Sequence, residues 1–118
     1  MEESILKSIK LLLGGNESDD DDAFDKHLIM HINSVFTILH QLGVGPEEPF
    51  YITDGEAVWT DFLPEGDIEA VKTYVFMKVK LVFDPPANSF VVEMYKDYIK
   101  EFEWRMNVRS EELADDKQ

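Results

Sequence analysis

The sequence predicts an all-α fold, a small bundle of four to five helices with an irregular loop around residues 43–55. Three observations predict it. Apolar residues recur at helical spacing in separate stretches of the chain. Glycine or proline follows several of these stretches, where helices commonly end. The chain has 118 residues and is 44% apolar, which suits a single domain that buries its own core.

The first expected helix covers residues 2–13. Ile5, Ile9 and Leu12 fall on one stripe of this helix, at the spacing of a buried helical face. The pair Gly14–Gly15 is expected to end it, because glycine adopts the left-handed conformation of a helix C-cap at little cost.

The longest regular helical pattern covers residues 24–42. Its apolar stripe consists of Leu28, Ile32, Val35, Leu39 and Leu42. Ile29 and Phe36 widen the stripe, so that the helix is apolar over much of its circumference. We expect such a helix to be contacted on more than one side.

Residues 44–54 are expected to be extended, because one glycine and two prolines interrupt them. Within this stretch, residues 50–52 fit either a short strand or a loop pinned by its aromatic side chains. Thr53 and Glu56 then have the spacing of a capping box, which predicts a short helix over residues 56–63.

Residues 67–83 fit two structures. The segment is rich in β-formers and partly alternates, but its apolar residues also form a helical stripe. Seventeen residues without a turn signal are too many for a typical strand, so the pattern favours a helix.

A last helix is expected over residues 89–108, followed by a polar, disordered tail at 110–118. The stripe of this last helix consists of Val91, Tyr95, Tyr98, Phe102 and Met106.

The chain is strongly acidic, with 25 acidic residues against 11 basic ones and a formal charge of -14. Such a surface repels phosphate, which argues against a specific grip on DNA or RNA. The acids are concentrated in the tail and in an expected mobile loop over residues 15–23. The candidate acidic site in this loop consists of Asp19, Asp20, Asp21 and Asp22.

No pattern in the sequence singles out a catalytic, cofactor or metal site. The chain has no cysteine, which excludes thiol catalysis and cysteine-bound zinc. His27 and His31 are four residues apart on one expected helix, a spacing that can direct two imidazoles at one ion, but no third ligand has a telling position. Residues 19–22 lack the alternating acids and central glycine of a calcium-binding loop. We therefore expect no metal, no cofactor and no enzymatic activity.

The aromatic residues include the candidate contacts with other proteins. Phe50, Tyr51, Trp59 and Phe62 cluster around proline-containing breaks rather than on the long helices. They either cover one end of the bundle or form a partner interface, where aromatic residues are enriched. Trp104 lies off the stripe of the last helix and is the best single candidate for an intermolecular contact.

Several strings of residues together resemble a family of small head–tail connector (adaptor) proteins of tailed phages and prophages, namely siphophages of Gram-positive bacteria. The resemblance covers residues 1–109, taken as the connector domain, and it favours a helix over residues 67–83. The strings are Ile29–Phe36, Gln41–Pro46, Val71–Tyr74, Leu81–Pro86 and Glu101–Asn107. The acidic loop carries more aspartates than this family leads us to expect.

The resemblance implies a non-enzymatic virion protein at the head–tail junction, made and assembled in the cytoplasm of the bacterial host. Family members form a ring, commonly a dodecamer, between the portal protein and the stopper or tail-completion protein. DNA passes through the ring without specific binding, and no membrane is involved. A ring needs two different surfaces that meet head to tail, and the helix over residues 24–42 is a candidate for one of them.

Two other functions stay open from the residues alone. The acidic charge also suits a small regulatory protein or DNA mimic that blocks a nucleic-acid-binding partner. Such a protein would need carboxylates spaced along an outer face, whereas here they gather in a loop and a tail. A metal-dependent enzyme would depend on His27 and His31, which a metal titration would test.

Overall fold

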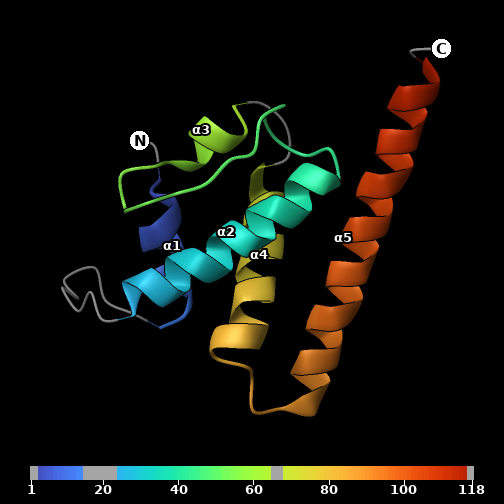
Figure 1. Cartoon of the computed structure of the whole chain (residues 1–118). Coiled ribbons are helices and arrows are strands. Elements are labelled where there is room, and N and C mark those ends of the chain that lie inside the picture. Colours follow the sequence, from blue (N-terminus) through green and yellow to red (C-terminus); the bar gives the residue numbers. More distant parts are fainter. Residues whose placement is uncertain (1–2, 15–23, 65–67, 117–118) are drawn as a thin grey trace.

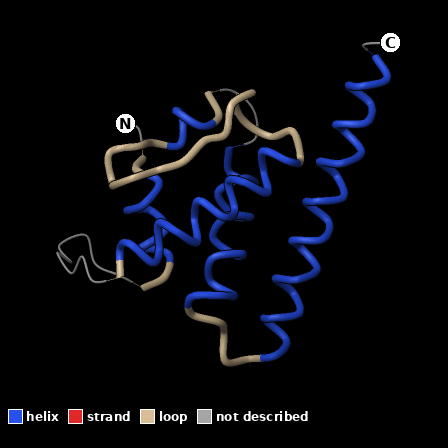
Figure 2. Tube along the Cα trace, viewed as in Figure 1, coloured by secondary structure: helices blue, strands red, loops and turns tan. Residues whose placement is uncertain are grey.

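The computed structural model describes residues 3–14, 24–64 and 68–116, and this part of the chain is a bundle of five helices without a β-sheet (Figures 1 and 2). The helices are α1 (Ile5–Leu12), α2 (Asp25–Gln41), α3 (Trp59–Phe62), α4 (Ile68–Phe83) and α5 (Ser89–Asp116). The predicted all-α bundle is therefore confirmed. The expected acidic loop, residues 15–23, lies outside the described residues.

Helix α4 is the central element of the bundle. Helix α2 crosses it, and α5 runs along another side of it (Figure 1). Helix α1 is tied to α4 by the ion pair between Glu3 and Lys72. The core between these helices is formed largely by α2 residues such as Ile32 and Leu39 and by Val75 and Val79 of α4, all fully buried. The C-terminal end of α5 projects beyond the other helices (Figure 1).

Helix α2 is contacted on more than one side, as its apolar circumference predicts. On one side it packs against α4. On another side the loop that leads to α3 passes along it (Figure 2), and the Asn33 carboxamide holds that loop. Of the apolar side chains within α2, only Met30 is exposed. The apolar stripe on which the expected oligomer surface of α2 was based is therefore covered by this chain's own segments.

Residues 50–52 form a pinned loop, not a strand. The Ile52 backbone N–H donates to Asn33 Oδ1 at 2.8 Å, and Asn33 Nδ2 donates to the Ile52 carbonyl at 2.9 Å. A single side chain thus satisfies both backbone groups of a residue whose own side chain is buried in the core. This contact fixes the otherwise irregular segment.

Helix α3 is one turn long, and the predicted capping box at Thr53 and Glu56 is wrong. Asp54 Oδ1 instead accepts from the Glu56 backbone N–H at 2.9 Å, a local turn. The helix starts later, where Asp61 Oδ2 accepts from the Val58 N–H at 3.1 Å. The preceding residues are extended because they pair with the start of α1, through an isolated bridge between Ser4 and Val58.

The ends of the long helices differ from the expected bounds. Helix α1 begins at Ile5, because the Ser4 side chain caps it by accepting from the Lys7 N–H. Helix α4 confirms the helical interpretation of residues 67–83 over its described part. Helix α5 continues to Asp116, so the predicted end at 108 is wrong, and residues 110–116 of the expected tail are helical. That stretch contains no glycine or proline and includes glutamate, leucine and alanine, which favour helices.

Candidate assembly surfaces

Most of the predicted aromatic cluster belongs to the core. Trp59 is 3% exposed and Phe62 1% exposed, so neither offers surface to a partner. The Phe36 ring lies between them, with its centroid 4.7 Å from that of Phe62 and 6.3 Å from that of Trp59. Phe50, half-buried, closes the cluster at 5.1 Å from Phe36. Of the two alternatives, a partner interface or packing within this chain, the second therefore applies to Phe50, Trp59 and Phe62.

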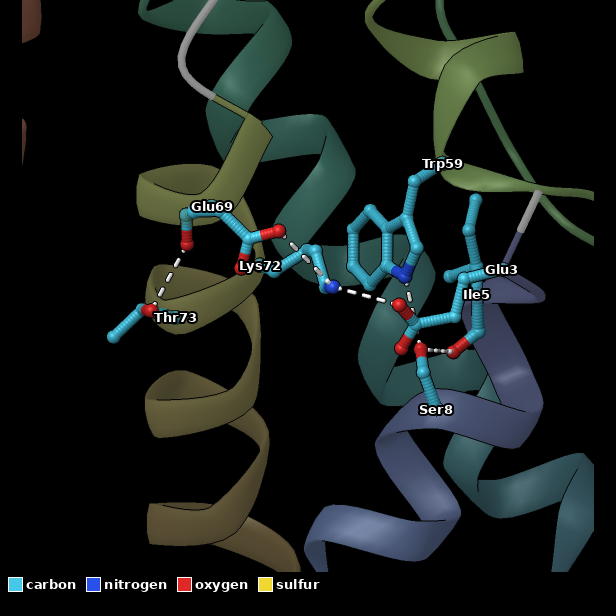
Figure 3. Close-up of polar contacts among 7 residues, drawn as sticks. All are labelled: Glu3, Ile5, Ser8, Trp59, Glu69, Lys72 and Thr73. Atoms are coloured by element: carbon cyan, nitrogen blue, oxygen red, sulfur yellow. Dashed lines mark hydrogen bonds and ion pairs between the residues drawn. The ribbon is translucent and has the colours of Figure 1, made fainter. Parts of the chain in front are cut away.

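A buried hydrogen-bond chain fixes the indole of Trp59 (Figure 3). Trp59 Nε1 donates to Ser8 Oγ at 2.9 Å, and Ser8 Oγ donates to the Ile5 carbonyl at 3.0 Å. Each polar atom of the buried pair thus has a partner, as burial requires. This hydrogen-bond chain holds α3 against α1. The indole N–H of Trp59 therefore already has its hydrogen-bond partner inside the protein.

Two predicted contact residues remain at the surface. Tyr51 is 55% exposed, and Trp104 is 65% exposed on α5. Other exposed apolar residues, among them Phe24 and Phe90, had no signal in the sequence, because each stands at a helix end where periodicity gives little information.

Among the described residues, no third ligand joins His27 and His31 in a group that could hold a metal ion. The His31 ring packs against Phe83, with centroids 6.3 Å apart, and Phe24 packs on the same phenylalanine at 6.1 Å. Within residues 3–14, 24–64 and 68–116, no three histidine, aspartate or glutamate side chains gather where they could hold a metal ion.

None of the helices in the described part combines the length and apolar content needed to cross a membrane.

A hollow of about 360 Å³ lies open to solvent between α1 and α4. At its polar end, Lys72 Nζ lies 2.8 Å from Glu3 Oε2 and 3.5 Å from Glu69 Oε1 (Figure 3). The hydrogen bond to Glu3 and the nearby carboxylates raise the pKa of Lys72 above its ordinary value. The lining residues are Glu3, Ser8, Leu11, Leu12, Glu69, Lys72, Thr73 and Phe76. Away from these charges the hollow is lined by the apolar residues Leu11, Leu12 and Phe76 and by the small polar residues Ser8 and Thr73.

Helix α5 is attached to α4 through aromatic contacts and a hydrogen bond, and one of these contacts joins Phe76 and Tyr95, whose ring centroids are 6.2 Å apart. The Tyr74 and Phe102 rings stack with centroids 4.4 Å apart, and the Tyr74 hydroxyl donates to Glu103 Oε2 at 2.6 Å. Lys78 Nζ lies 3.7 Å from the same carboxylate and 5.9 Å from the centre of the Tyr74 ring. Burial of Tyr74, together with its bond to Glu103, raises the pKa of the phenol well above 10.0.

The side of α5 that faces away from α4 carries exposed apolar residues. Ile99 and Phe102 are buried on the inner side. Phe90, Met94 and Trp104 are all exposed, and their positions along the helix place them away from the inner stripe. Isolated exposed apolar residues are ordinary, but this helix presents several on one side. The outer side of α5 and the hollow are the two candidate assembly surfaces.

Charge is distributed unevenly over these surfaces. The segments 3–14 and 68–83, which contain α1 and α4, have a combined formal charge of +3 in a chain of -14. Residues 101–116, the C-terminal half of α5, have a formal charge of −4. The lysines of the first two segments are Lys7, Lys10, Lys72, Lys78 and Lys80, against Glu3 and Glu69. The charged residues that line the hollow itself, Glu3, Glu69 and Lys72, have a net formal charge of −1.

Comparison with known proteins agrees with this picture of a helical protein with contact surfaces. The model of a family described as "Phage connector protein" matches residues 5–113, from the first helix almost to the end of α5. Neither curated proteins nor solved structures gave a match to this chain. Because the matched range covers nearly the whole chain, the protein belongs to the phage connector protein family, a family of structural virion proteins.

Proposed function

We propose that this protein is a head–tail connector subunit that forms a ring between the portal protein and the stopper or tail-completion protein. The observation that carries the proposal is the match to the connector family over residues 5–113. In this proposal the virion ring is a dodecamer of a siphophage or prophage of a Gram-positive host. Family membership favours this role over that of a DNA mimic or of a metal-dependent enzyme.

The surface of the monomer supports the proposal. A head-to-tail ring requires two different surfaces on each subunit. The structure has an apolar hollow between α1 and α4 and exposed apolar residues on the outer side of α5. Dispersed subunits must also stay soluble before assembly, and a charge of -14 keeps copies apart by self-repulsion.

The acidic charge is also suited to a channel through which DNA passes. Basic patches hold DNA because phosphate binding releases counterions, and a carboxylate-lined channel does not offer that gain. DNA in transit would therefore not adhere to the ring. This part of the proposal requires only that acidic side chains outnumber basic ones around the channel.

The test is the mass of the purified protein, alone and mixed with its cognate portal, at low and high salt. We expect a ring-sized species, favoured by the portal, by high protein concentration and by salt, because salt screens the repulsion between acidic copies. A protein that stays monomeric in all of these conditions would contradict the proposed function. Mass on the portal also gives the number of copies, which decides whether the ring is a dodecamer.

A further inference from the structure

We propose that α5 can leave α4 of its own chain and pack in the same way on α4 of a neighbouring copy, so that copies exchange this helix head to tail. The inference rests on the proposed ring and specifies how its copies are joined. The partner is a second copy of this chain, and the surface that its α5 covers is the one that α5 covers in the monomer. Three features support the exchange: the attachment of α5, the loop before it and the contact that is exchanged.

Helix α5 is attached to the bundle through α4. Among the described residues, the hydrogen bonds, ion pairs and ring contacts between α5 and other helices all involve α4. They comprise the stack of Phe102 on Tyr74, the bonds of Glu103, and the contact between Tyr95 and Phe76. With 28 residues, α5 also exceeds the length of about 12–15 residues below which isolated helices are marginal. The helix can therefore move as one body without breaking a described polar or ring contact to α1, α2 or α3.

The loop of residues 84–88 joins α4 and α5 at one end of the bundle (Figure 1), and most of its side chains are exposed. The Asp84 carboxylate pairs with Lys80 of α4 at 3.4 Å, and Asn88 Oδ1 accepts from the Phe90 N–H of α5 at 2.8 Å. Each end of the loop is thus bonded to the helix that it adjoins. Opening the loop between these two ends leaves both bonds in place.

Two prolines favour an extended form of this loop. Pro85 and Pro86 fix their own φ near about −65°, and each pushes the residue before it out of the helical region. Five extended residues span at most about 17 Å. This length exceeds the separation of about 8–10 Å between the axes of packed helices. An opened loop can therefore carry α5 past its own α4 to that of a neighbour.

The exchanged contact is the same as the contact within the monomer. Ile99 and Phe102 are 7% and 6% exposed, and Tyr74, which stacks on Phe102, is fully buried. A helix that leaves its own α4 exposes these side chains, and a second copy covers them again with the same groups. The free energy of the contact therefore nearly cancels, and the loop and the protein concentration decide the balance. Because each copy gives one helix and receives another, the contact is heterologous and forms a ring where the rotation closes.

Crosslinking between introduced cysteines distinguishes the two arrangements, because the chain has no cysteine of its own. Phe76→Cys with Tyr95→Cys joins α4 to α5, at a pair whose native ring centroids are 6.2 Å apart. Phe24→Cys with Phe83→Cys joins the start of α2 to α4, at a pair 6.1 Å apart, and is the matched control. Each double variant is treated with a short bis-maleimide, once as dispersed monomer and once after assembly on the cognate portal. Denaturing gel electrophoresis then separates single chains from joined chains.

We expect the α4–α5 pair to give single chains from the monomer and a ladder of joined chains after assembly, because its two cysteines then meet between copies. The control pair should give single chains in both states, since α2 and α4 stay together. Crosslinking of α4 to α5 before assembly should abolish ring formation, and crosslinking of the control pair should not. Circular dichroism verifies the fold. If the first double variant does not fold, Lys78→Cys with Glu103→Cys, across the 3.7 Å ion pair, replaces it.

The contrary outcomes are distinguishable. Single chains from the α4–α5 pair in assembled rings, or rings formed by the crosslinked monomer, would overturn the exchange and leave the proposed ring intact. Equal ladders from both pairs would also overturn it, because chance contacts between copies would then explain the joined chains. If the wild type forms no ring with or without portal, the proposed function fails, and this inference fails with it.

Discussion

The segment from residue 43 to α3 and helix α5 are held to the bundle in different ways. The first looks irregular, yet it is fixed by the Asn33 carboxamide, by the pairing of Ser4 with Val58, and by the aromatic residues around Phe36. Helix α5 is the longest regular element, yet it packs chiefly on α4. Regular secondary structure and strength of attachment are therefore separate properties. The fixed segment stabilises the monomer, and the outer side of α5 keeps Phe90, Met94 and Trp104 exposed.

The comparison between the two tryptophans gives the largest expected effect. Trp59→Ala should lower the free energy of unfolding by about 3–5 kcal/mol, because it leaves a cavity in the core and removes the donor to Ser8. Trp104→Ala should lower it by less than about 1 kcal/mol, because that indole is 65% exposed. Urea unfolding of the two monomers measures both. A large loss of unfolding free energy in Trp104→Ala would show that this residue belongs to the core. The contrast between the two tryptophans would then be wrong.

Two glycines with nearly the same backbone conformation test the packing of the fixed segment. Gly45 has a φ of +96°, and a Cβ added there would lie 2.5 Å from the Phe62 ring. Gly14 has a φ of +98° and nothing within 4 Å of such a Cβ. Both alanine substitutions incur the strain of a positive φ, about 1 kcal/mol, but Gly45→Ala should cost about 1–3 kcal/mol more because Phe62 must move.

Thermal melting of the two glycine variants gives the difference directly, since the conformational strain is common to both. Equal melting temperatures would mean that Phe62 adjusts freely, and the segment would then be held more loosely than the structure indicates.

The bond between Tyr74 and Glu103 tests the attachment of α5. Tyr74→Phe keeps the stacked ring but removes the hydroxyl, so at neutral pH it should lower the free energy of unfolding by about 1–2 kcal/mol. Tyr98→Phe is the control, because its hydroxyl has no hydrogen-bond partner among the described residues. Chemical denaturation of the three proteins measures the effect. Equal losses in the two variants would show that the bond to Glu103 adds nothing.

The same tyrosine gives a pH dependence with a definite sign. Burial and Glu103 raise its folded-state pKa above the ordinary 10.0, so above that pH the unfolded chain releases a proton that the folded chain retains. The stability from this group is complete below about pH 10 and falls as the pH rises further. Lys72, whose pKa is also raised, acts in the same direction. Tyr74→Phe should therefore lose stability less steeply than the wild type above about pH 10.

The smallest expected effect concerns the acidic stretch, Asp19 to Asp22, which lies outside the described residues. Replacing these four residues by asparagine should leave stability unchanged or slightly higher, because exposed like charges repel one another only modestly in water. The variant should also assemble normally. If the stretch lines the channel, phage carrying the variant should retain or eject DNA abnormally. Wild-type infectivity and ejection kinetics would exclude the channel role, and loss of folding would show that the stretch is structural.

The sequence predicted the long helices because their signals are local. The stripe of α2 and the glycine after α1 depend on neighbouring residues only. The structure buries the stripe from Leu28 to Leu39, with Leu42 at the C-cap, and gives Gly14 a positive φ. The capping of α3 could not be predicted in this way. Val58 pairs with Ser4, more than fifty residues away, and this pairing delays the start of the helix past the local Thr53 and Glu56 signal.

The candidate surfaces were predictable only in part. Trp104 stood out because it lies off a clear helical stripe, and the structure places it at the surface. Trp59 and Phe62 are aromatic, as interface residues often are, so residue type alone does not separate core from interface. Only their tertiary neighbours show that they belong to the core. The hollow between α1 and α4 had no signal at all, because Leu12 and Phe76 approach one another only through the packing of distant helices.

The most direct test of the account is a reconstruction of the protein bound to its cognate portal at a resolution that separates helices. The account predicts a closed ring of copies that contact one another on the portal. Single copies on the portal without contacts to one another would contradict it.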